Sequence, residues 1–152
     1  SGVKRKILFI YPSNEPSYPL QLGSLSAYVK KSGHKSRLLP LLIPGVLNEE
    51  HYSKIKQTLE ELKPDFVGFS GYEMAFPWIK SISTYIKKSW PKVKIVVGGY
   101  YPTLDPEDVI SFPSIDVICI GEGEAPLQEL MSGKPGNYKI KNLWFKKGKK
   151  IM

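Results

Sequence analysis

The sequence predicts an α/β protein with a doubly wound parallel sheet, and three observations support this fold class. Short apolar runs recur along the chain, and each is typical of a strand buried on both faces. Stretches with apolar residues at helical spacing separate these runs. Glycine, proline and small polar residues follow the runs directly, as expected where strands end in loops. With 152 residues, the chain has the length of one domain.

The first strand is expected over residues 6–10, which form a near-continuous apolar run. A loop rich in turn-forming residues follows it. Leu22, Leu25 and Val29 then recur at helical spacing, and this helix ends in basic residues before Gly33. The first two elements are therefore a strand and a helix.

A weaker second strand is expected over residues 37–42. Its Pro40 favours an edge position in the sheet, because proline cannot donate a ladder hydrogen bond. A helix is expected over residues 49–62, with Asn48 as its N-cap and Pro64 beyond its end.

The third strand is expected over residues 66–69, and the next helix begins near Pro77, in the first turn where a helix tolerates proline. The fourth strand follows over residues 93–97. Asp105 and Pro106 then mark a helix start, as a capping carboxylate followed by proline at the first helical position.

The fifth strand is expected over residues 116–120, and a final helix begins over residues 125–131. Right-handed crossovers and five strands favour a flavodoxin-like (Rossmann-like) sheet with the order 2-1-3-4-5. We expect residues 3–131 to form this domain. Residues 132–152 are expected to be a basic linker, with a weak alternation that suits a hairpin, at the start of a connection to a further domain that this chain lacks.

The positive charge of the chain is concentrated in this linker. The net charge is +8, but Glu129 is the last acidic residue and seven lysines follow it. The region before the linker is therefore close to neutral, and we expect no nucleic-acid partner and no membrane partner. Cys119 is the only cysteine and is expected to be buried, which fits a reducing cytoplasm. We find no secretory signal and expect a monomer.

Three loops suggest a binding site. Residues 69–73, 98–103 and 121–124 each follow an apolar run directly, and loops at the carboxyl ends of parallel strands share one edge of the sheet. Their small residues expose the backbone, and their tyrosines offer flat surfaces to a large, partly apolar ligand. For Gly98 and Gly99, a tight turn between strand and loop explains the glycines equally well. Glu124 suits the start of a helix as well as it suits a site.

The sequence offers no catalytic or metal-binding arrangement. No Gly-x-Gly-x-x-Gly motif follows the first strand, and no Walker motif is present. His34 and His51 are the only histidines, and we expect both on the surface. No Ser-His-Asp or Cys-His arrangement can be placed, so we expect neither catalytic residues nor a metal site within the chain.

The chain resembles the N-terminal cobalamin-binding domain of radical S-adenosylmethionine enzymes. The resemblance covers residues 6–131 and rests on four segments: Leu20 to Leu25, Lys63 to Ser70, Val96 to Thr103 and Gly121 to Glu124. Each segment is weak alone, but the order and spacing together are specific.

The resemblance implies that the corrin ring of cobalamin lies across the carboxyl edge of the sheet. The Asp-x-His-x-x-Gly motif of other cobalamin domains is absent, which implies base-off binding without a histidine ligand. The implied cobalamin-binding residues are Ser70, Gly71, Tyr72, Gly98, Gly99, Tyr100, Thr103, Gly121, Glu122 and Gly123.

The cysteine triplet that binds the 4Fe-4S cluster in radical enzymes is missing. The resemblance therefore implies a module that is not catalytic alone. The cluster and S-adenosylmethionine are expected only in a radical barrel domain in cis, within a parent methyltransferase or cyclase. The alternative is a flavodoxin-like scaffold or interaction domain that has lost cobalamin binding. A receiver domain is excluded because Ser70 stands where its phosphoacceptor aspartate is required.

Overall fold

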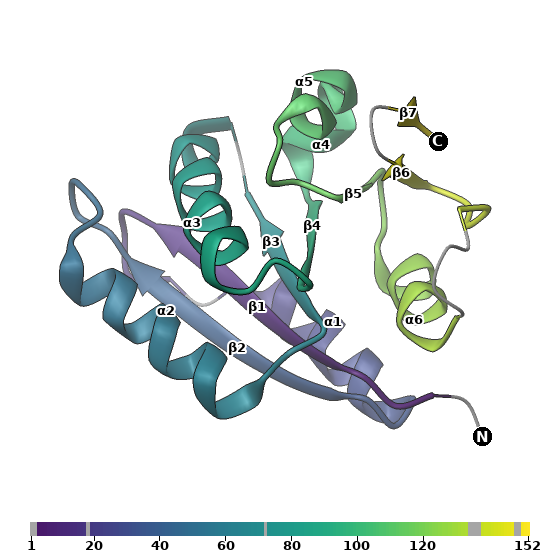
Figure 1. The fold of residues 1–152 in the computed structure, drawn as a ribbon, viewed down its shortest axis with the longest axis horizontal. Helices are drawn as coiled ribbons and strands as arrows, with labels where there is room; N and C mark the ends of the chain where they lie inside the picture. The colour runs from purple at the N-terminus through teal and green to yellow at the C-terminus, as the bar shows by residue number, and fades with distance from the viewer. Residues whose placement is uncertain (1–2, 18, 72, 134–137, 148–149) are drawn as a thin grey trace.

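Seven strands form one sheet in the computed structural model, in the order β2-β1-β3-β4-β5-β6-β7 (Figure 1). The structure describes residues 3–17, 19–71, 73–133, 138–147 and 150–152, with the backbone path only for residues 100, 101, 147 and 150. The strands are β1 (Lys6–Ser13), β2 (Lys35–Leu42), β3 (Phe66–Ser70), β4 (Lys94–Gly98), β5 (Val117–Cys119), β6 (Leu143–Lys147) and β7 (Lys150–Ile151). The first five pair in parallel, so the predicted fold class and the order 2-1-3-4-5 are confirmed.

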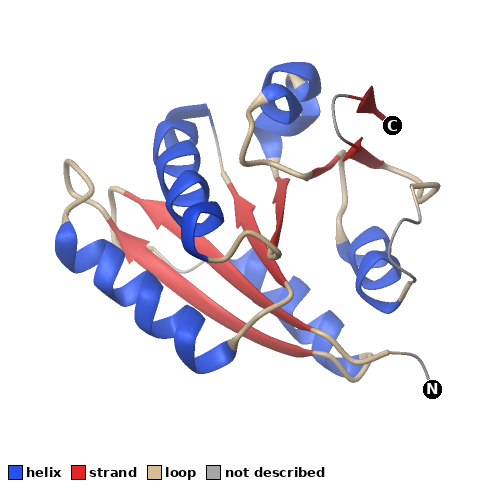
Figure 2. Cartoon of the chain, viewed as in Figure 1, coloured by secondary structure: helices blue, strands red, loops and turns tan. Residues whose placement is uncertain are grey.

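Helices cover both faces of the sheet (Figure 2). They are α1 (Leu20–Lys31), α2 (Glu49–Leu62), α3 (Phe76–Ser89), α4 (Tyr100–Leu104), α5 (Pro106–Ser111) and α6 (Glu124–Ser132), with a 3-10 turn over Glu73–Ala75. One core lies between the sheet and α2, α3 and α5, and the other lies between the sheet and α1 and α6. No described helix is long and apolar enough to cross a membrane.

The two cores explain the continuous apolar run at the start of the chain. Leu8 and Ile10 belong to the core under α2 and α3, whereas Ile7 and Phe9 belong to the core under α1 and α6. All four side chains are buried. A strand covered on both faces has no polar side, so its sequence shows no alternation.

β2 is the edge strand, as Pro40 predicted. The backbone N–H groups of Lys35 and Ile43 donate to β1, at 3.0 and 2.7 Å. Because bonding alternates along a parallel strand, Pro40 faces the open edge, where it interrupts the row of free N–H groups. Exposed Lys35 and Arg37 further disfavour pairing with another strand.

The expectation that both histidines lie on the surface is wrong. His51 closes a capping box at the start of α2: Asn48 N–H donates to His51 Nδ1 at 3.0 Å, and His51 N–H donates to Asn48 Oδ1 at 3.2 Å. His51 Nε2 donates to the carbonyl of Leu42 at 2.9 Å. The ring therefore joins the end of β2 to the start of α2, a role that spacing alone did not indicate.

His34 joins three separate segments. Arg5 N–H donates to His34 Nδ1 at 3.0 Å, and His34 Nε2 donates to Ser132 Oγ at 2.9 Å. The ring therefore connects the start of β1, the turn before β2 and the end of α6. Burial lowers the pKa of His34, and the positive charges of Lys4 and Arg5 lower it further.

β6 extends the sheet beyond the five predicted strands. It pairs antiparallel with β5, and its Leu143 and Phe145 are buried beside Met131 and Ile140. Trp144 packs against the opposite core. β6 and β7 form an antiparallel pair, the hairpin that the weak alternation suited. The division of the chain at residue 131 stays a prediction.

Truncation of Phe145 tests whether β6 contributes to the stability of the sheet. We expect Phe145→Ala to lower the free energy of unfolding in urea by about 3 kcal/mol, because a large buried side chain leaves a cavity. Lys139→Ala, at an exposed position of the same segment, serves as the control and should change the midpoint little. Similar unfolding curves for the two variants would show that β6 packs only loosely.

His34 makes stability depend on pH. Its pKa is lowered in the folded state, so the folded chain binds this proton less readily than the unfolded chain does. Its contribution is fully present above the unfolded value of about 6.5 and is lost as the pH falls below that value. When the free energy of unfolding is measured by urea denaturation from pH 7.5 to 5, it should fall more steeply for the parent chain than for His34→Gln. Equal slopes would contradict this assignment.

Candidate functional site

The carboxyl ends of β1 to β5 meet at one edge of the sheet, the position where open α/β sheets bind ligands. The three loops singled out in the sequence all lie there. Ser70 and Gly98 are register partners at the ends of β3 and β4, so the first two loops leave the sheet side by side. We refer to this region as the carboxyl edge.

Gly99 is required by contact between these two loops. Its φ is +103°, and a Cβ at this position would lie 3.0 Å from Ser70 Oγ and 3.1 Å from the nitrogen of Gly71. The close approach of the two backbones excludes a side chain, and the φ value favours glycine independently. Packing and backbone conformation thus explain the glycine at position 99 without a bound ligand.

The remaining glycines divide into two kinds. A Cβ on Gly71 would lie 2.9 Å from Ile79 Cδ1, so Gly71 makes room for α3. A Cβ on Gly98 would meet only Cys119 Cβ, at an ordinary 3.7 Å, and a Cβ on Gly121 would meet nothing within 4 Å. Gly98 and Gly121 therefore leave open surface that a larger side chain would cover.

Thr103 ties the second loop to the third. Its hydroxyl donates to the carbonyl of Gly99 at 3.0 Å and accepts from the N–H of Gly121 at 3.1 Å. Ser70, Gly71, Gly99, Thr103 and Gly121 therefore form one connected group across the ends of three strands. The loops are held by their own contacts.

The other predicted site residues lie beside this group or are not among the residues, or the side chains, that the structure describes. Glu122 is exposed, and its carbonyl accepts from the Cys119 thiol at 3.9 Å. Gly123 is half-buried directly before α6. Tyr72 lies outside the described residues, and for Tyr100 only the backbone in α4 is described. Their assignment to a site stays a prediction.

The carboxyl edge carries no positively charged side chain in its loops. None of the connections that follow β1 to β5 contains Lys or Arg, although the chain has 22 of them. Acidic residues stand there instead: Glu15, Glu73, Asp105, Glu122 and Glu124. The helices begin at this edge, and their positive N-terminal dipoles favour negative charge. The edge is therefore suited to a neutral or cationic ligand.

Exposed apolar side chains surround the same edge, a feature that the sequence analysis missed. They come from four connections and are 47% to 82% exposed. We call these residues the apolar rim: Leu20, Leu42, Val46, Met74 and Leu104. Large exposed apolar residues that gather at one place indicate a binding surface. They are recognisable in the sequence only once their loops are known to meet.

The side chains most suited to metal coordination are engaged elsewhere. Both ring nitrogens of His34 and of His51 make hydrogen bonds within the chain. Cys119 is buried, as predicted, and burial raises the pKa of its thiol to about 11. Within the described ranges, no three His, Cys, Asp or Glu side chains are grouped to hold a metal ion.

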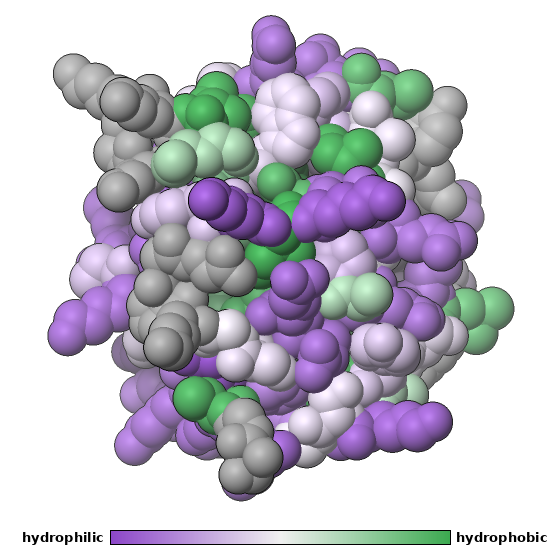
Figure 3. Space-filling view, turned by 90° about the vertical axis from the view of Figure 1, so that its right-hand side faces the viewer, coloured by the Kyte–Doolittle hydropathy of each residue, from purple (hydrophilic) through white to green (hydrophobic). Residues whose placement is uncertain are grey.

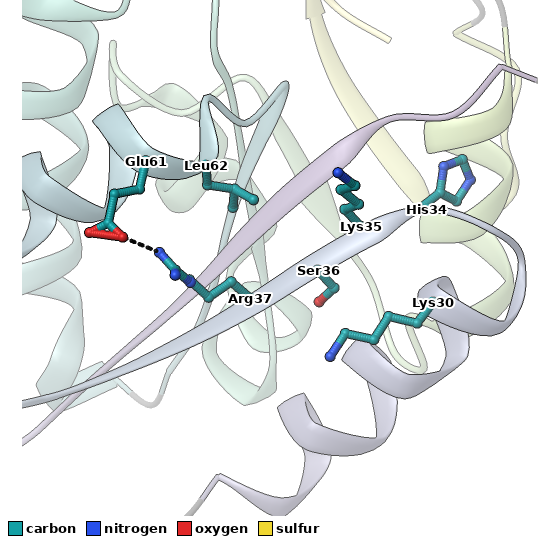
Figure 4. A pocket seen from close by; sticks show the side chains of 7 residues that line it. All are labelled: Lys30, His34, Lys35, Ser36, Arg37, Glu61 and Leu62. Atoms are coloured by element: carbon teal, nitrogen blue, oxygen red, sulfur yellow. Dashed lines mark ion pairs between the residues drawn. The ribbon is translucent and has the colours of Figure 1, made fainter.

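Two cavities lie away from the carboxyl edge. One, of about 410 Å³, is an open polar groove beside β2, between α1 and α2 (Figure 4). Arg37 and Glu61 face each other across it at 3.6 Å, and both side chains are half exposed. His34 lines this groove, but its ring bonds to α6. The second cavity lies at the opposite, amino edge of the sheet.

Comparison with known proteins gives a consistent result. The family model "B12 binding domain" matches residues 12–131. An anaerobic magnesium-protoporphyrin IX monomethyl ester cyclase from Synechocystis is 29% identical over 115 residues, which cover 75% of this chain and 23% of the relative. The cobalamin-dependent radical SAM methyltransferase TokK from Streptomyces tokunonensis is 25% identical over 130 residues, covering 84% of this chain and 18% of the relative.

A solved structure shares the fold. A cobalamin-binding protein from Desulfitobacterium hafniense superposes with a TM-score of 0.58 and 14% identity, over 83% of this chain and 56% of that one. At this identity the likeness concerns the fold alone. The chain spans less than a quarter of the length of the two curated relatives described above.

The Cys119 thiol should be chemically inert in the folded chain. Its pKa of about 11, against an ordinary 9.0, leaves about a hundredfold less thiolate at neutral pH. Iodoacetamide should therefore label the native chain about a hundredfold more slowly, or slower still, than the urea-unfolded chain. Mass spectrometry measures the two labelling rates. Comparable labelling rates in the two states would show that the end of β5 is open to solvent.

Proposed function

This chain belongs to the B12 binding domain family, and on that premise we propose that it binds cobalamin across the carboxyl edge of its sheet. The membership confirms the resemblance predicted from the sequence. The observation that carries the proposal is the open backbone surface at Gly98 and Gly121, framed by the apolar rim. A corrin ring is large, flat and partly apolar, and such a surface accommodates it without a closed cavity.

The residues present fit the group. A side chain at Gly98 or Gly121 would occupy the open surface, so these positions form a cradle that a Cβ would fill. Leu20, Met74 and Leu104 would contact the apolar parts of the corrin ring. The absence of Lys and Arg from these loops suits a ring with neutral amide side chains.

We propose that cobalamin binds base-off and takes no histidine ligand from this chain. His51 is the histidine nearer to the carboxyl edge, and its two ring nitrogens are bonded to Asn48 and Leu42. A cobalt ligand would require one of these bonds to break and the capping box of α2 to open. His34 is bonded at the amino end of the sheet. Both observations support a site without an imidazole ligand.

Each group of residues has a distinct task in this proposal. Bound cobalamin supplies the cobalt chemistry. Ser70 and Gly71 hold the floor of the site, since Gly99 packs directly on them. Thr103 fixes the third loop against the second, which keeps Gly121 to Gly123 in place at the side of the ring. Tyr72 and Tyr100 are proposed to line it. Glu122 would accept hydrogen bonds from peripheral amide groups.

We further propose that the chain is the cobalamin module of a larger radical S-adenosylmethionine enzyme. The relatives include a cyclase and a methyltransferase that extend far beyond the matched region. A barrel domain in cis would hold the 4Fe-4S cluster and S-adenosylmethionine, with residues 3–131 as the module and residues 132–152 leading to the barrel. We propose a cytoplasmic monomer that has no nucleic-acid or membrane partner.

A second candidate is a scaffold that keeps the fold without the cofactor. The packing reasons found for Gly71 and Gly99 favour it, because two of the glycines would persist in a domain that binds nothing. Gly121 also has a reason of its own, because its φ of +76° favours glycine, so Gly98 is the position that distinguishes the two candidates.

The proposal is tested by titrating the purified chain with hydroxocobalamin and then desalting it. Corrin absorbance that stays with the protein, with a base-off spectrum, is the expected result. A base-on spectrum would contradict the proposed ligation while leaving binding intact. Loss of all corrin on desalting, together with no spectral change during titration, would favour the scaffold.

Gly98 is the position at which to block the site. Gly98→Trp should reduce cobalamin retention at least tenfold by covering the open surface, whereas Gly98→Ala should retain binding because its Cβ makes only an ordinary contact. Ser53→Trp, on the exposed face of α2, is the matched control. Circular dichroism checks that each variant folds. Equal retention by Gly98→Trp and Ser53→Trp would place the cofactor elsewhere.

A further inference from the structure

A second cavity lies at the amino edge, on the side of the sheet opposite the proposed cobalamin site. Its volume is about 320 Å³, within the range of small-molecule sites. It is bounded by the starts of β3, β4 and β5, by β6, and by Arg5, Leu130, Gly133 and Tyr138. In Figure 1 this region lies between the N-terminus of β1 and the segments α6 and β6.

The inner wall of this cavity is apolar and partly aromatic. Phe66, Val93 and Val117 come from the parallel strands, and Phe145 comes from β6. Tyr138 meets Phe145 edge to face, with ring centroids 5.3 Å apart. A wall of this kind favours a flat or branched apolar group.

The two carboxylates beside the cavity are already satisfied by the protein. Asp65 Oδ2 accepts from the N–H of Lys6 at 2.9 Å. Asp116 Oδ2 accepts from the N–H of Ile95 at 2.8 Å and pairs with Lys87 Nζ at 2.6 Å. Asp116 is thus paired with a cation of α3, whereas the N–H that Asp65 accepts from is neutral and does not compensate its carboxylate.

The cations that line the cavity outnumber these two carboxylates: they are Arg5, Lys92, Lys94 and Lys146. Lys92 and Lys94 are exposed at its mouth. Arg5 Nη1 donates to the carbonyl of Met131, and Lys146 Nζ donates to the carbonyl of Phe112 at 2.6 Å. A carbonyl satisfies a donor but does not neutralise its charge, and although Asp116 also interacts with Lys146, the lining keeps an excess of positive charge. The residues outside the described ranges contain no Asp or Glu that could compensate it.

The surface of the molecule agrees with this arrangement. The side that carries α6 and β6 shows hydrophobic atoms at its centre, between long hydrophilic side chains (Figure 3). Burial lowers the pKa of Lys146, and the Asp116 carboxylate raises it.

We propose that this amino-edge cavity binds a small amphipathic anion, a ligand with an aromatic or branched apolar body and one carboxylate, sulfonate or phosphate group. The apolar body would lie against Phe66, Val117 and Phe145, and the anionic group would face Lys92 and Lys94. The site is separate from the carboxyl edge, so a ligand here and cobalamin can be bound at the same time.

The dye 8-anilino-1-naphthalenesulfonate has this chemistry and serves as the probe. Its fluorescence should rise on addition of the purified chain, and affinity should fall as salt is raised. The double variant Lys92→Gln, Lys94→Gln should bind it about fivefold more weakly, since each exposed charge pair contributes modestly. The matched control Lys54→Gln, Lys56→Gln removes two exposed charges from α2 and should bind as the parent does.

Two further measurements locate the dye. Leu130→Trp, which fills the cavity from α6, should abolish binding while circular dichroism stays unchanged. Saturating hydroxocobalamin should leave dye binding unaffected, so failure of one site is distinguishable from failure of the other. Equal dye affinity in the two double variants, or displacement of the dye by cobalamin, would overturn the proposal.

Discussion

The burial of β1 between two cores is the constraint on which the rest of the structure depends. Leu8 and Ile10 are covered from one face and Ile7 and Phe9 from the other, so β1 can only be a central strand. With β1 fixed between β2 and β3, the parallel pairing of β1 to β5 places the loop after each of these strands at the same edge. The carboxyl edge is therefore a consequence of chain topology, before any functional residue is considered.

At that edge, the protein's own packing accounts for part of what looks like a binding motif. Gly71 leaves room for α3, and Gly99 leaves room for Gly71, so both glycines allow close packing at the junction of β3 and β4. Gly121 has a φ of +76°, which favours glycine by itself, so Gly98 is the one of these four that neither packing nor φ explains. The proposed cofactor site would thus combine a packed floor with an open position at Gly98, and Thr103 would hold the loops together. Rigid support of this type limits the entropy that a bound ligand costs.

The distribution of charge follows from the direction of the helices. Their N-termini point to the carboxyl edge, where acidic residues are favourable, and their C-termini point to the amino edge, where Lys30, Lys31, Lys87 and Lys88 stand. Helix dipoles thereby separate the charges of the molecule into two edges of different chemistry. One edge is apolar and free of cations in its loops, and the other combines cations with an aromatic wall. Under the two proposals, cobalamin and an amphipathic anion would therefore bind at different edges.

The sequence by itself determined the fold, the strand order, the edge position of β2 and the burial of Cys119, because these depend on local periodicity and on proline chemistry. It also located the three loops, since each follows an apolar run directly. Only the tertiary structure decided the roles of His34 and His51, whose partners at Ser132 and Leu42 lie on other elements. The tertiary structure alone distinguished the packed Gly99 from the open Gly98. It also showed that the apolar rim residues lie at one edge and that β6 extends the sheet. Contacts between distant segments depend on how the elements meet in space, and no local pattern records that.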